Sequence, residues 1–455
     1  MTEIPPRSAP PPATPLSGAY RAVWRWHFYA GVLVMPFLML LALTGGLYLF
    51  KDEIDGAVYR RMAEVPASPH QAAPEAWAAA AAQVGDGRAA SLILPAEPTQ
   101  AARVRVDRPD GSRRTVFVDP HTGHVTGVTG YGGVMETVKR IHSLALFGPM
   151  MNLLVEVVAG WTIVLFATGL YLWWPSKRQV GVVTLTSTDV RRRPFWRDLH
   201  ALTGIYVGGV VLFLAVTGMP WSAVWGDKVM DVVKTSGLGR PAAPVAGAWQ
   251  QAEHADHPQG AGWTMEGMVL PAHAHQPASA GLSEVIALAE AARLPRPYAV
   301  SIPKADATTW TVTAQVTRVQ DARALYIDPA QGRVLADIGY DQFGAGARAI
   351  EWGIYTHQGT QFGQINRWVM LAGCIGVWLL AVSGLMMWWK RRPPRLSRGL
   401  IGAPPVPDGL QLRFAVLAIV LPLCLLYPLT GASLVLALIG ERLIRVVIRS
   451  RPAAP

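Results

Sequence analysis

The chain has 455 residues, of which 51% are apolar and only 16% are charged. Because a soluble globular chain usually has about 25% charged residues, this composition excludes an ordinary soluble domain and favours a membrane protein. The formal net charge of +11 is gathered in loops beside apolar runs. It therefore indicates membrane topology and argues against nucleic acid as a partner.

Five long apolar runs are separated by polar segments. A helix needs about 20 apolar residues to cross a hydrocarbon core of about 30 Å, and each run approaches or exceeds that length. A Pro-rich leader at 1–18 is expected to be disordered in the cytoplasm. The predicted membrane segments are 20–50, 134–174, 197–225, 346–390 and 411–440, and the second and fourth each begin with a short interfacial helix.

The first run is too long for the apolar core of a cleaved signal peptide, so we expect it to stay in the membrane. The loops 175–196 and 391–410 are rich in Lys and Arg, and short loops of this kind stay in the cytoplasm. The N-terminus is then cytoplasmic, and the segments 51–133 and 226–345 lie in the periplasm of a bacterial inner-membrane protein. The tail at 441–455 is also basic, although five crossings would place it outside. Either a surface helix there or an incomplete last crossing would resolve the conflict.

The chain repeats itself. His27 precedes the pair Thr44-Gly45 by 17 positions, and His200 precedes Thr217-Gly218 by the same 17. His142 precedes Gly169 by 27 positions, and His357 precedes Gly384 by 27. Two parallel repeats imply a pseudo-twofold axis along the membrane normal. Equivalent residues are expected to face one another across this axis.

The outer segments repeat as well. Residues 116–125 and 325–334 each read as a strand, an Asp-Pro-x-x-Gly turn and a second strand, and an Ala-rich helical stretch lies upstream of each. Each segment is therefore predicted to be a small α+β domain with one helix and an antiparallel meander. The predicted fold is an internally duplicated α-helical membrane bundle of about five transmembrane helices, with two such domains outside.

Four of the 11 histidines occupy equivalent repeat positions at membrane boundaries, namely His27, His142, His200 and His357. Neutral imidazole is a good axial ligand for haem iron, and the absence of a C-x-x-C-H motif excludes covalent c-type attachment. The spacing favours His27 with His200 near the cytoplasmic face and His142 with His357 near the outer face. We therefore predict two bis-histidine b-type haems, with the four histidines as ligands of the haem iron.

Small and basic residues near these histidines are suited to a haem. Gly31, Gly45, Gly204 and Gly218 would leave space beside the ring, and Arg25, Arg140, Arg197 and Arg348 would bind the propionates. Two alternatives remain open at this point. The histidines would be interfacial anchors or hydrogen-bonding core residues, or only one of the two pairs would hold a haem.

Other chemistry-bearing residues are less specific. Glu156 lies at membrane depth, where an ionisable side chain is a functional candidate, although a position at the interface is also expected. Four histidines at 254, 257, 273 and 275 have metal-ligand spacing but fall in a stretch that reads as a solvated loop. Cys374 and Cys424 read as packing residues. Nucleotide-binding and flavin-binding motifs are absent from the sequence, so electrons must come from an unknown cytoplasmic or membrane donor.

The combination of motifs resembles the PepSY-associated transmembrane family over residues 20–435. The matching motifs are Trp24-Arg-Trp-His27, Arg140-Ile-His142, Trp196-Arg-Asp-Leu-His200, Tyr355-Thr-His357 and the turns Asp119–Gly123 and Asp328–Gly332. This family includes inner-membrane ferric-siderophore reductases. The resemblance implies PepSY-like domains at 51–133 and 226–345, the second with an insertion, and haem-dependent reduction of ferric siderophores in the periplasm.

Two other functions fit the same sequence. The chain would be a haem b electron-transfer protein with another acceptor or donor, such as quinol or a respiratory component. Alternatively, it would be a protein without enzymatic activity, whose outer domains bind a partner and whose helices anchor it. The repeated histidines argue against the second of these, because an anchor does not need them.

Overall fold

The computed structural model describes residues 18–174, 184–241, 281–303, 309–328, 332–391, 417–418 and 421–449. The predicted leader, most of the loop 391–410, the histidines at 254–275 and the last residues of the tail lie outside these ranges. The chain divides into two units. The first comprises residues 1–37, 160–208 and 379–455, and the second comprises 38–159 and 209–378. The unit boundaries fall within long helices.

Three helices are long and apolar enough to cross a membrane: α1 (Gly18–Tyr48), α5 (Pro149–Trp173) and α11 (Gly363–Trp389). A fourth crossing is formed if α6 (Arg193–Tyr206) and α7 (Gly208–Gly218), with the short helix η2 (Met219–Trp221), are taken as one span bent by 54°. The third predicted helix is therefore not straight. The helices identify the chain as a membrane protein.

The bend between α6 and α7 has a sequence cause. Two adjacent glycines, Gly208 and Gly209, lie at the break, and such pairs are common points of helix kinking. The ring of Phe166 packs so closely here that a Cβ on Gly208 would stand 3.1 Å from it. A larger residue at 208 would therefore push Phe166 away.

The fifth apolar run was predicted to form one helix over 411–440, but the structure has a break within it. Its described part is interrupted at Tyr427, and α13 (Pro428–Arg449) begins with the proline, whose missing N–H costs nothing in the first turn. The apolar part of α13, Pro428–Gly440, rises only about 20 Å, which is too short to cross the core. The helix then continues without a break into the basic tail.

In the first unit, α13 packs tightly against α5. The indole of Trp161 donates a hydrogen bond to the Ser433 hydroxyl at 2.8 Å, and a Cβ on Gly160 would collide with the Thr430 side chain. The last apolar run is thus fixed to the bundle by small-residue packing, as is common between membrane helices.

Two short helices, α4 (Gly133–His142) and α10 (Ala345–His357), precede α5 and α11 and end at their histidines. The sequence predicted a break after each, and the structure has both. After α4 the chain turns through η1 (Ala145–Phe147) and Gly148, whose φ of +107° favours glycine. After α10 it turns at Gly359, with φ +77°.

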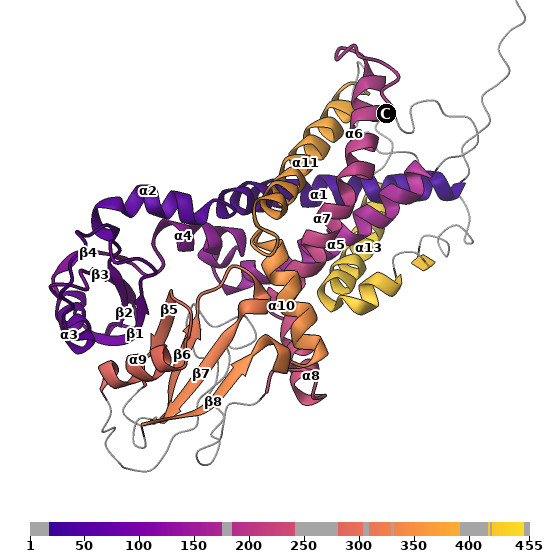
Figure 1. The fold of residues 1–455 in the computed structure, drawn as a ribbon. Helices are drawn as coiled ribbons and strands as arrows, with labels where there is room; N and C mark the ends of the chain where they lie inside the picture. The colour runs from indigo at the N-terminus through magenta and orange to yellow at the C-terminus, as the bar shows by residue number, and fades with distance from the viewer. Residues whose placement is uncertain are drawn as a thin grey trace, which may run out of the picture. The chain divides into compact units, whose positions relative to one another are not determined.

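The two predicted outer domains share one eight-stranded antiparallel sheet in the second unit (Figure 1). The first four strands are β1 (Arg88–Leu94), β2 (Ala102–Asp107), β3 (Arg113–Val118) and β4 (Val125–Gly130). The last four are β5 (Tyr298–Ser301), β6 (Trp310–Ala314), β7 (Arg323–Asp328) and β8 (Arg333–Gly339). Their order is β4-β3-β2-β1-β5-β6-β7-β8, so β1 pairs with β5 and each meander runs outward from this seam.

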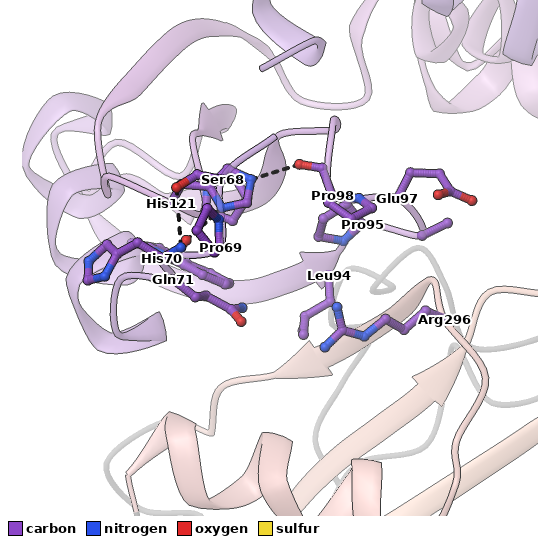
Figure 2. A pocket seen from close by; sticks show the side chains of 13 residues that line it. Ser68, Pro69, His70, Gln71, Leu94, Pro95, Glu97, Pro98, His121 and Arg296 are labelled. Carbon is purple, nitrogen blue, oxygen red and sulfur yellow. Dashed lines mark hydrogen bonds between the residues drawn. The ribbon is translucent and has the colours of Figure 1, made fainter. Parts of the chain in front are cut away.

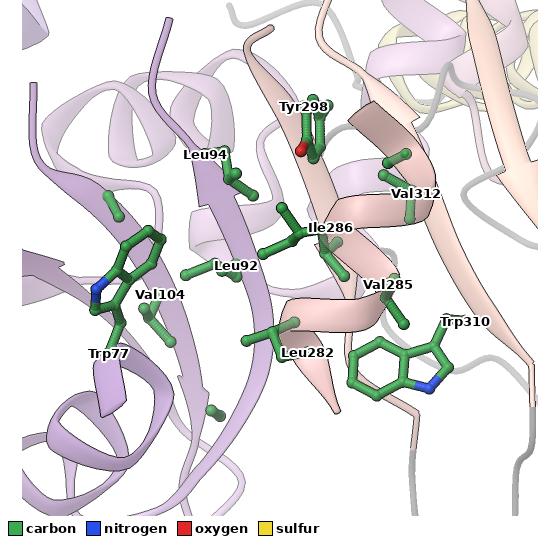
Figure 3. Packing of buried hydrophobic residues seen from close by; sticks show 14 of the residues in the cluster. Trp77, Leu92, Leu94, Val104, Leu282, Val285, Ile286, Tyr298, Trp310 and Val312 are labelled. Carbon is green, nitrogen blue, oxygen red and sulfur yellow. The ribbon is translucent and has the colours of Figure 1, made fainter. Parts of the chain in front are cut away.

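Helices α3 (Pro74–Gly85) and α9 (Leu282–Ala291) supply apolar side chains to the core of the sheet. Figure 3 shows Trp77 from α3 beside Val104, and Val285 from α9 near Val312. All four are fully buried, and burial of such a side chain is worth roughly 1.5–3 kcal/mol. One apolar core therefore joins the two meanders.

The remaining helices of the second unit are α2 (Lys51–Ala63), which follows α1, and α8 (Trp225–Thr235), which follows η2. Both have charged and apolar residues in alternation, and α8 is amphipathic over three turns. Helix α8 matters for the site because its N-terminal end holds a buried acid, described below.

Candidate functional site

His27 on α1 and His200 on α6 face one another in the first unit. Their ring centroids are 6.4 Å apart and their planes are nearly perpendicular, at 88°. Both rings are half-buried. The structure therefore brings together one of the two pairs that the repeat predicted.

The separation fits two imidazoles on opposite sides of one metal ion. A metal–imidazole bond is about 2 Å long and the ring centroid lies about 1 Å beyond the nitrogen, so two opposed rings have centroids about 6 Å apart. A direct hydrogen bond would bring the rings closer, whereas an edge-to-face ring contact has centroids about 4.5–7 Å apart and fits the same distance. The geometry thus suits a shared axial role.

The outer histidines lie together in the second unit, at the ends of α4 and α10. Burial lowers the pKa of His142 to about 4. Burial first, and the neighbouring His142 second, lower the pKa of His357 to about 3. A helix C-terminus favours a cationic histidine, but here burial outweighs that effect. Both imidazoles are held neutral, which metal ligation requires.

Each of the four histidines is held at Nδ1 by a hydroxyl from a long helix. The pairs, with the distance from Nδ1 to the hydroxyl oxygen, are His27 and Thr168 at 2.9 Å, His142 and Thr44 at 3.0 Å, His200 and Ser383 at 3.1 Å, and His357 and Thr217 at 2.9 Å. The threonines at 44 and 217 belong to the Thr-Gly pairs that define the repeat. They contact His142 and His357, and not the histidines from which the 17-residue spacing is counted.

The glycines of the repeat leave space for the imidazoles. Gly45 faces His142, Gly169 faces His27, Gly218 faces His357 and Gly384 faces His200. A Cβ at Gly45 or Gly169 would stand only 3.2 Å from the ring Cε1. Gly45 and Gly218, predicted to lie beside a haem ring, thus contact the imidazoles. Gly31 and Gly204 make no such contact, since a Cβ on either would meet only a leucine at 3.9 or 3.8 Å.

The other nitrogen of each imidazole ring, Nε2, makes no hydrogen bond to any described residue. The described ranges also contain no cluster of three or more His, Cys, Asp or Glu that would hold a bare metal ion. Two imidazoles alone leave most of an ion's coordination open, whereas a porphyrin supplies the remaining ligands in one plane. The residues therefore fit a haem better than a simple metal site.

The four arginines that were predicted to bind the haem propionates differ in their exposure and in their contacts. In the first unit, the guanidinium of Arg25 lies 4.9 Å from the ring centroid of Tyr29, and Arg197 Nε donates to Asp198 at 2.7 Å. Arg140 is exposed two residues before its histidine. Arg348 is exposed nine residues before its histidine, on the opposite side of α10 and roughly 13 Å along the axis. The helix therefore does not bring Arg348 to the site.

Sequence reasoning missed one further cation. Arg391 lies over the indole of Trp24 in the first unit, with its guanidinium carbon 4.6 Å from the ring centroid. Trp24 belongs to the Trp-Arg-Trp-His motif, so this contact places a positive charge beside the motif that carries His27. The basic loop that follows the fourth apolar run was the signal for such a charge.

Glu156 is fully buried. Its Oε2 accepts hydrogen bonds from the backbone N–H groups of Val224 at 3.1 Å and Trp225 at 3.0 Å, where α8 begins. A carboxylate is favourable at a helix N-terminus because four N–H groups there have no helical partner. Within the same turn, the Trp221 ring centroid lies 5.5 Å from that of His357. Glu156 thus fixes a turn that contacts the outer pair.

A second buried acid, Glu351, was not singled out by the sequence. It forms an ion pair with Arg240 at 2.6 Å, and the two side chains are 0% and 4% exposed. Glu351 lies six residues before His357 on α10, as Glu136 lies six residues before His142 on α4. This spacing within the repeat was the available signal.

A cavity of about 230 Å³ lies among the loops that precede α3 and follow β1 and β3, and the residues that line it are drawn in Figure 2. The imidazole of His121 lies in the wall of this cavity, 7% exposed, with Nε2 2.8 Å from the Pro98 carbonyl oxygen and Nδ1 2.8 Å from that of His70. Carbonyls only accept, so both nitrogens must carry protons. These bonds, to Pro98 first and His70 second, raise the pKa of His121 above its usual value.

A family model described as the PepSY-associated TM region matches residues 24–391. The chain belongs to this family. The matched range contains all four histidines and both halves of the sheet, and the resemblance predicted from the sequence is confirmed. No curated protein matches this PepSY-associated protein.

Proposed function

We propose that this PepSY-associated protein is a transmembrane di-haem b reductase. It passes electrons across the bacterial inner membrane and reduces ferric iron in siderophore complexes in the periplasm, which aids iron release and uptake. The observation that carries the proposal is the pair His27 and His200, whose rings face one another at 6.4 Å, with neither Nε2 atom hydrogen-bonded to a residue that the structure describes.

In this proposal the chain is internally duplicated, and each haem site is formed by equivalent residues from the two halves. His27 and His200 bind the inner haem, and His142 and His357 bind the outer haem. Bound haem supplies reversible one-electron chemistry. The protein would contribute the imidazoles that hold the group and their orientation through the Thr and Ser hydroxyls.

The direction of electron flow follows from the loop charges. Basic loops keep the N-terminus and the His27 pair on the cytoplasmic side, so the His142 pair and the sheet face the periplasm. The electron comes from a cytoplasmic or membrane donor. One electron converts Fe(III) to Fe(II), and the hard oxygen donors of siderophores bind the softer, less charged Fe(II) more weakly.

The test follows electrons from the reduced protein to iron. Purified protein is reduced without oxygen, then mixed with a ferric hydroxamate or ferric catecholate complex. Reoxidation of the haem bands and trapping of Fe(II) by a chelator are recorded together. We expect one Fe(II) for each haem electron lost.

Variants locate the transfer. His142→Ala, which removes the outer haem, should slow iron reduction at least tenfold, whereas His124→Ala, which changes an exposed histidine of the sheet, should not. Haem that stays reduced in the presence of ferric siderophores would refute iron reduction. The related electron-transfer role would then be tested with quinol. A protein without haem would leave partner binding by the PepSY-like domains as the function.

A further inference from the structure

The four hydroxyls that contact the histidines have their own protons committed elsewhere. Each donates to the backbone carbonyl four residues earlier on its own helix, as buried Ser and Thr commonly do. The bonds are Thr44 to Leu40 at 2.7 Å, Thr168 to Val164 at 2.7 Å, Thr217 to Phe213 at 2.6 Å and Ser383 to Leu379 at 2.5 Å. A hydroxyl has a single proton, so toward histidine each oxygen can only accept.

The histidines must therefore donate from Nδ1. His200 makes this explicit, because its Nδ1 also lies 3.1 Å from the carbonyl oxygen of Leu380, which can only accept. A neutral imidazole with a proton on Nδ1 has its lone pair on Nε2. All four histidines are therefore in the tautomer that a metal ligated through Nε2 requires.

Each hydroxyl also comes from the other helix of the same half of the chain. His27 on α1 contacts Thr168 on α5, and His357 on α10 contacts Thr217 on α7. The Nδ1 side of each ring thus links two helices within one half. The ring of His200, which belongs to the other half, lies 6.4 Å from that of His27, and the Nε2 atom of His27 is not used by the contact with Thr168.

We infer that Thr44, Thr168, Thr217 and Ser383 are positioning residues that select the histidine tautomer and aim Nε2 at the site between the halves. The expected effect on haem binding rests on the proposed function, whereas the assignment of the histidine tautomer does not. Removing such a partner of a metal-bound histidine typically costs 10–100-fold in affinity. It also makes the imidazole a weaker electron donor, which destabilises Fe(III) and raises the haem midpoint potential.

The experiment compares Thr168→Val with Thr168→Ser and Thr430→Val in the full-length protein. Valine has the shape of threonine without its hydroxyl, and serine retains the hydroxyl. Thr430→Val is the matched control, because Thr430 is buried in the same unit and its hydroxyl has no partner among the described residues. The readouts are the rate of haem loss to an excess haem scavenger, the two midpoint potentials and the histidine tautomers by nitrogen-15 NMR.

We expect Thr168→Val to lose the inner haem about tenfold faster and to raise one midpoint potential while the other stays unchanged. Thr168→Ser should restore both values. If Thr168→Val behaves like Thr430→Val in every readout, the inference is wrong although haem is bound. If the protein holds no haem, the proposed function is wrong, and the NMR measurement alone then tests the inference on the tautomer. Nδ1-protonated rings in the wild type, with one lost in Thr168→Val, support the inference, and Nε2-protonated rings overturn it.

Discussion

The inner and outer histidine pairs are positioned by different means. His27 and His200 lie within the helices α1 and α6, and the hydroxyls of Thr168 and Ser383 hold their rings. His142 and His357 end the short helices α4 and α10, each followed by a turn. Buried acids accompany both pairs. Asp198 lies two residues before His200 on α6, Glu351 lies six residues before His357 on α10, and Glu156 holds the turn that contacts His357. Because Glu156 and Glu351 belong to the second unit, we expect mutations of these two acids to affect the pair of His142 and His357 first.

The largest expected effect comes from the buried ion pair. Glu351→Gln leaves Arg240 as a buried charge without its partner, which typically costs 3–5 kcal/mol. We expect a lower unfolding temperature and loss of the outer haem with retention of the inner one. The double variant Arg240→Met with Glu351→Leu should recover much of the stability.

Exposed pairs supply the control for this prediction. Arg323 and Asp337 lie on the sheet and are 30% and 44% exposed, so Asp337→Asn should cost less than about 1 kcal/mol. Equal losses from Glu351→Gln and Asp337→Asn would mean that α10 does not depend on the buried pair.

Glu156 should have the next largest effect. Glu156→Leu leaves the N–H groups of Val224 and Trp225 without an acceptor, at a cost of about 2 kcal/mol. Glu156→Gln keeps an acceptor oxygen and should cost less. Thermal unfolding in detergent and the outer haem spectrum measure both. If Leu and Gln behave alike, the hydrogen bonds to α8 are not what the carboxylate contributes.

A smaller effect is expected from the glycines that face the imidazoles, and it allows a direct comparison of the two sites. Gly45→Ala and Gly169→Ala each place a methyl group against an imidazole, and each should reduce haem affinity about tenfold at its own site only. Gly56→Ala on α2 is the control, because a Cβ there meets open space. Loss of both haems from either single variant would contradict independent sites.

The smallest expected effect is a pH dependence in the sheet. A pKa of His121 raised by the Pro98 and His70 carbonyls means that the folded state binds the proton more tightly than the unfolded state. The stabilisation is complete below about pH 6.5, the unfolded value, and is lost as pH rises through the raised value. Unfolding temperature should fall over this range in the wild type.

His121→Ala should flatten this dependence, whereas the exposed His124→Ala should not. An unchanged slope in His121→Ala would show that other groups carry the pH dependence.

Much of the architecture was predictable from periodicity and repetition. Apolar length predicted α1, α5 and α11, and the equal spacings predicted which histidines meet. Pairing of β1 with β5 was not predictable, because each meander satisfies its own strand signals and nothing local marks the seam. The bend at Gly208 and the start of α13 at Pro428 were not predicted, although the pair Gly208-Gly209 and the proline are local signals for them. The partners of Glu156 and Glu351 are distant in sequence, so their burial was not visible.

The central claim is that each facing histidine pair binds one haem. The most direct test is the number of haems per chain, from the pyridine haemochrome of purified wild-type, His27→Ala, His142→Ala and double-variant protein. We expect two haems in the wild type, one in each single variant and none in the double variant. A wild-type protein without haem, or a haem content unchanged by either substitution, would contradict it.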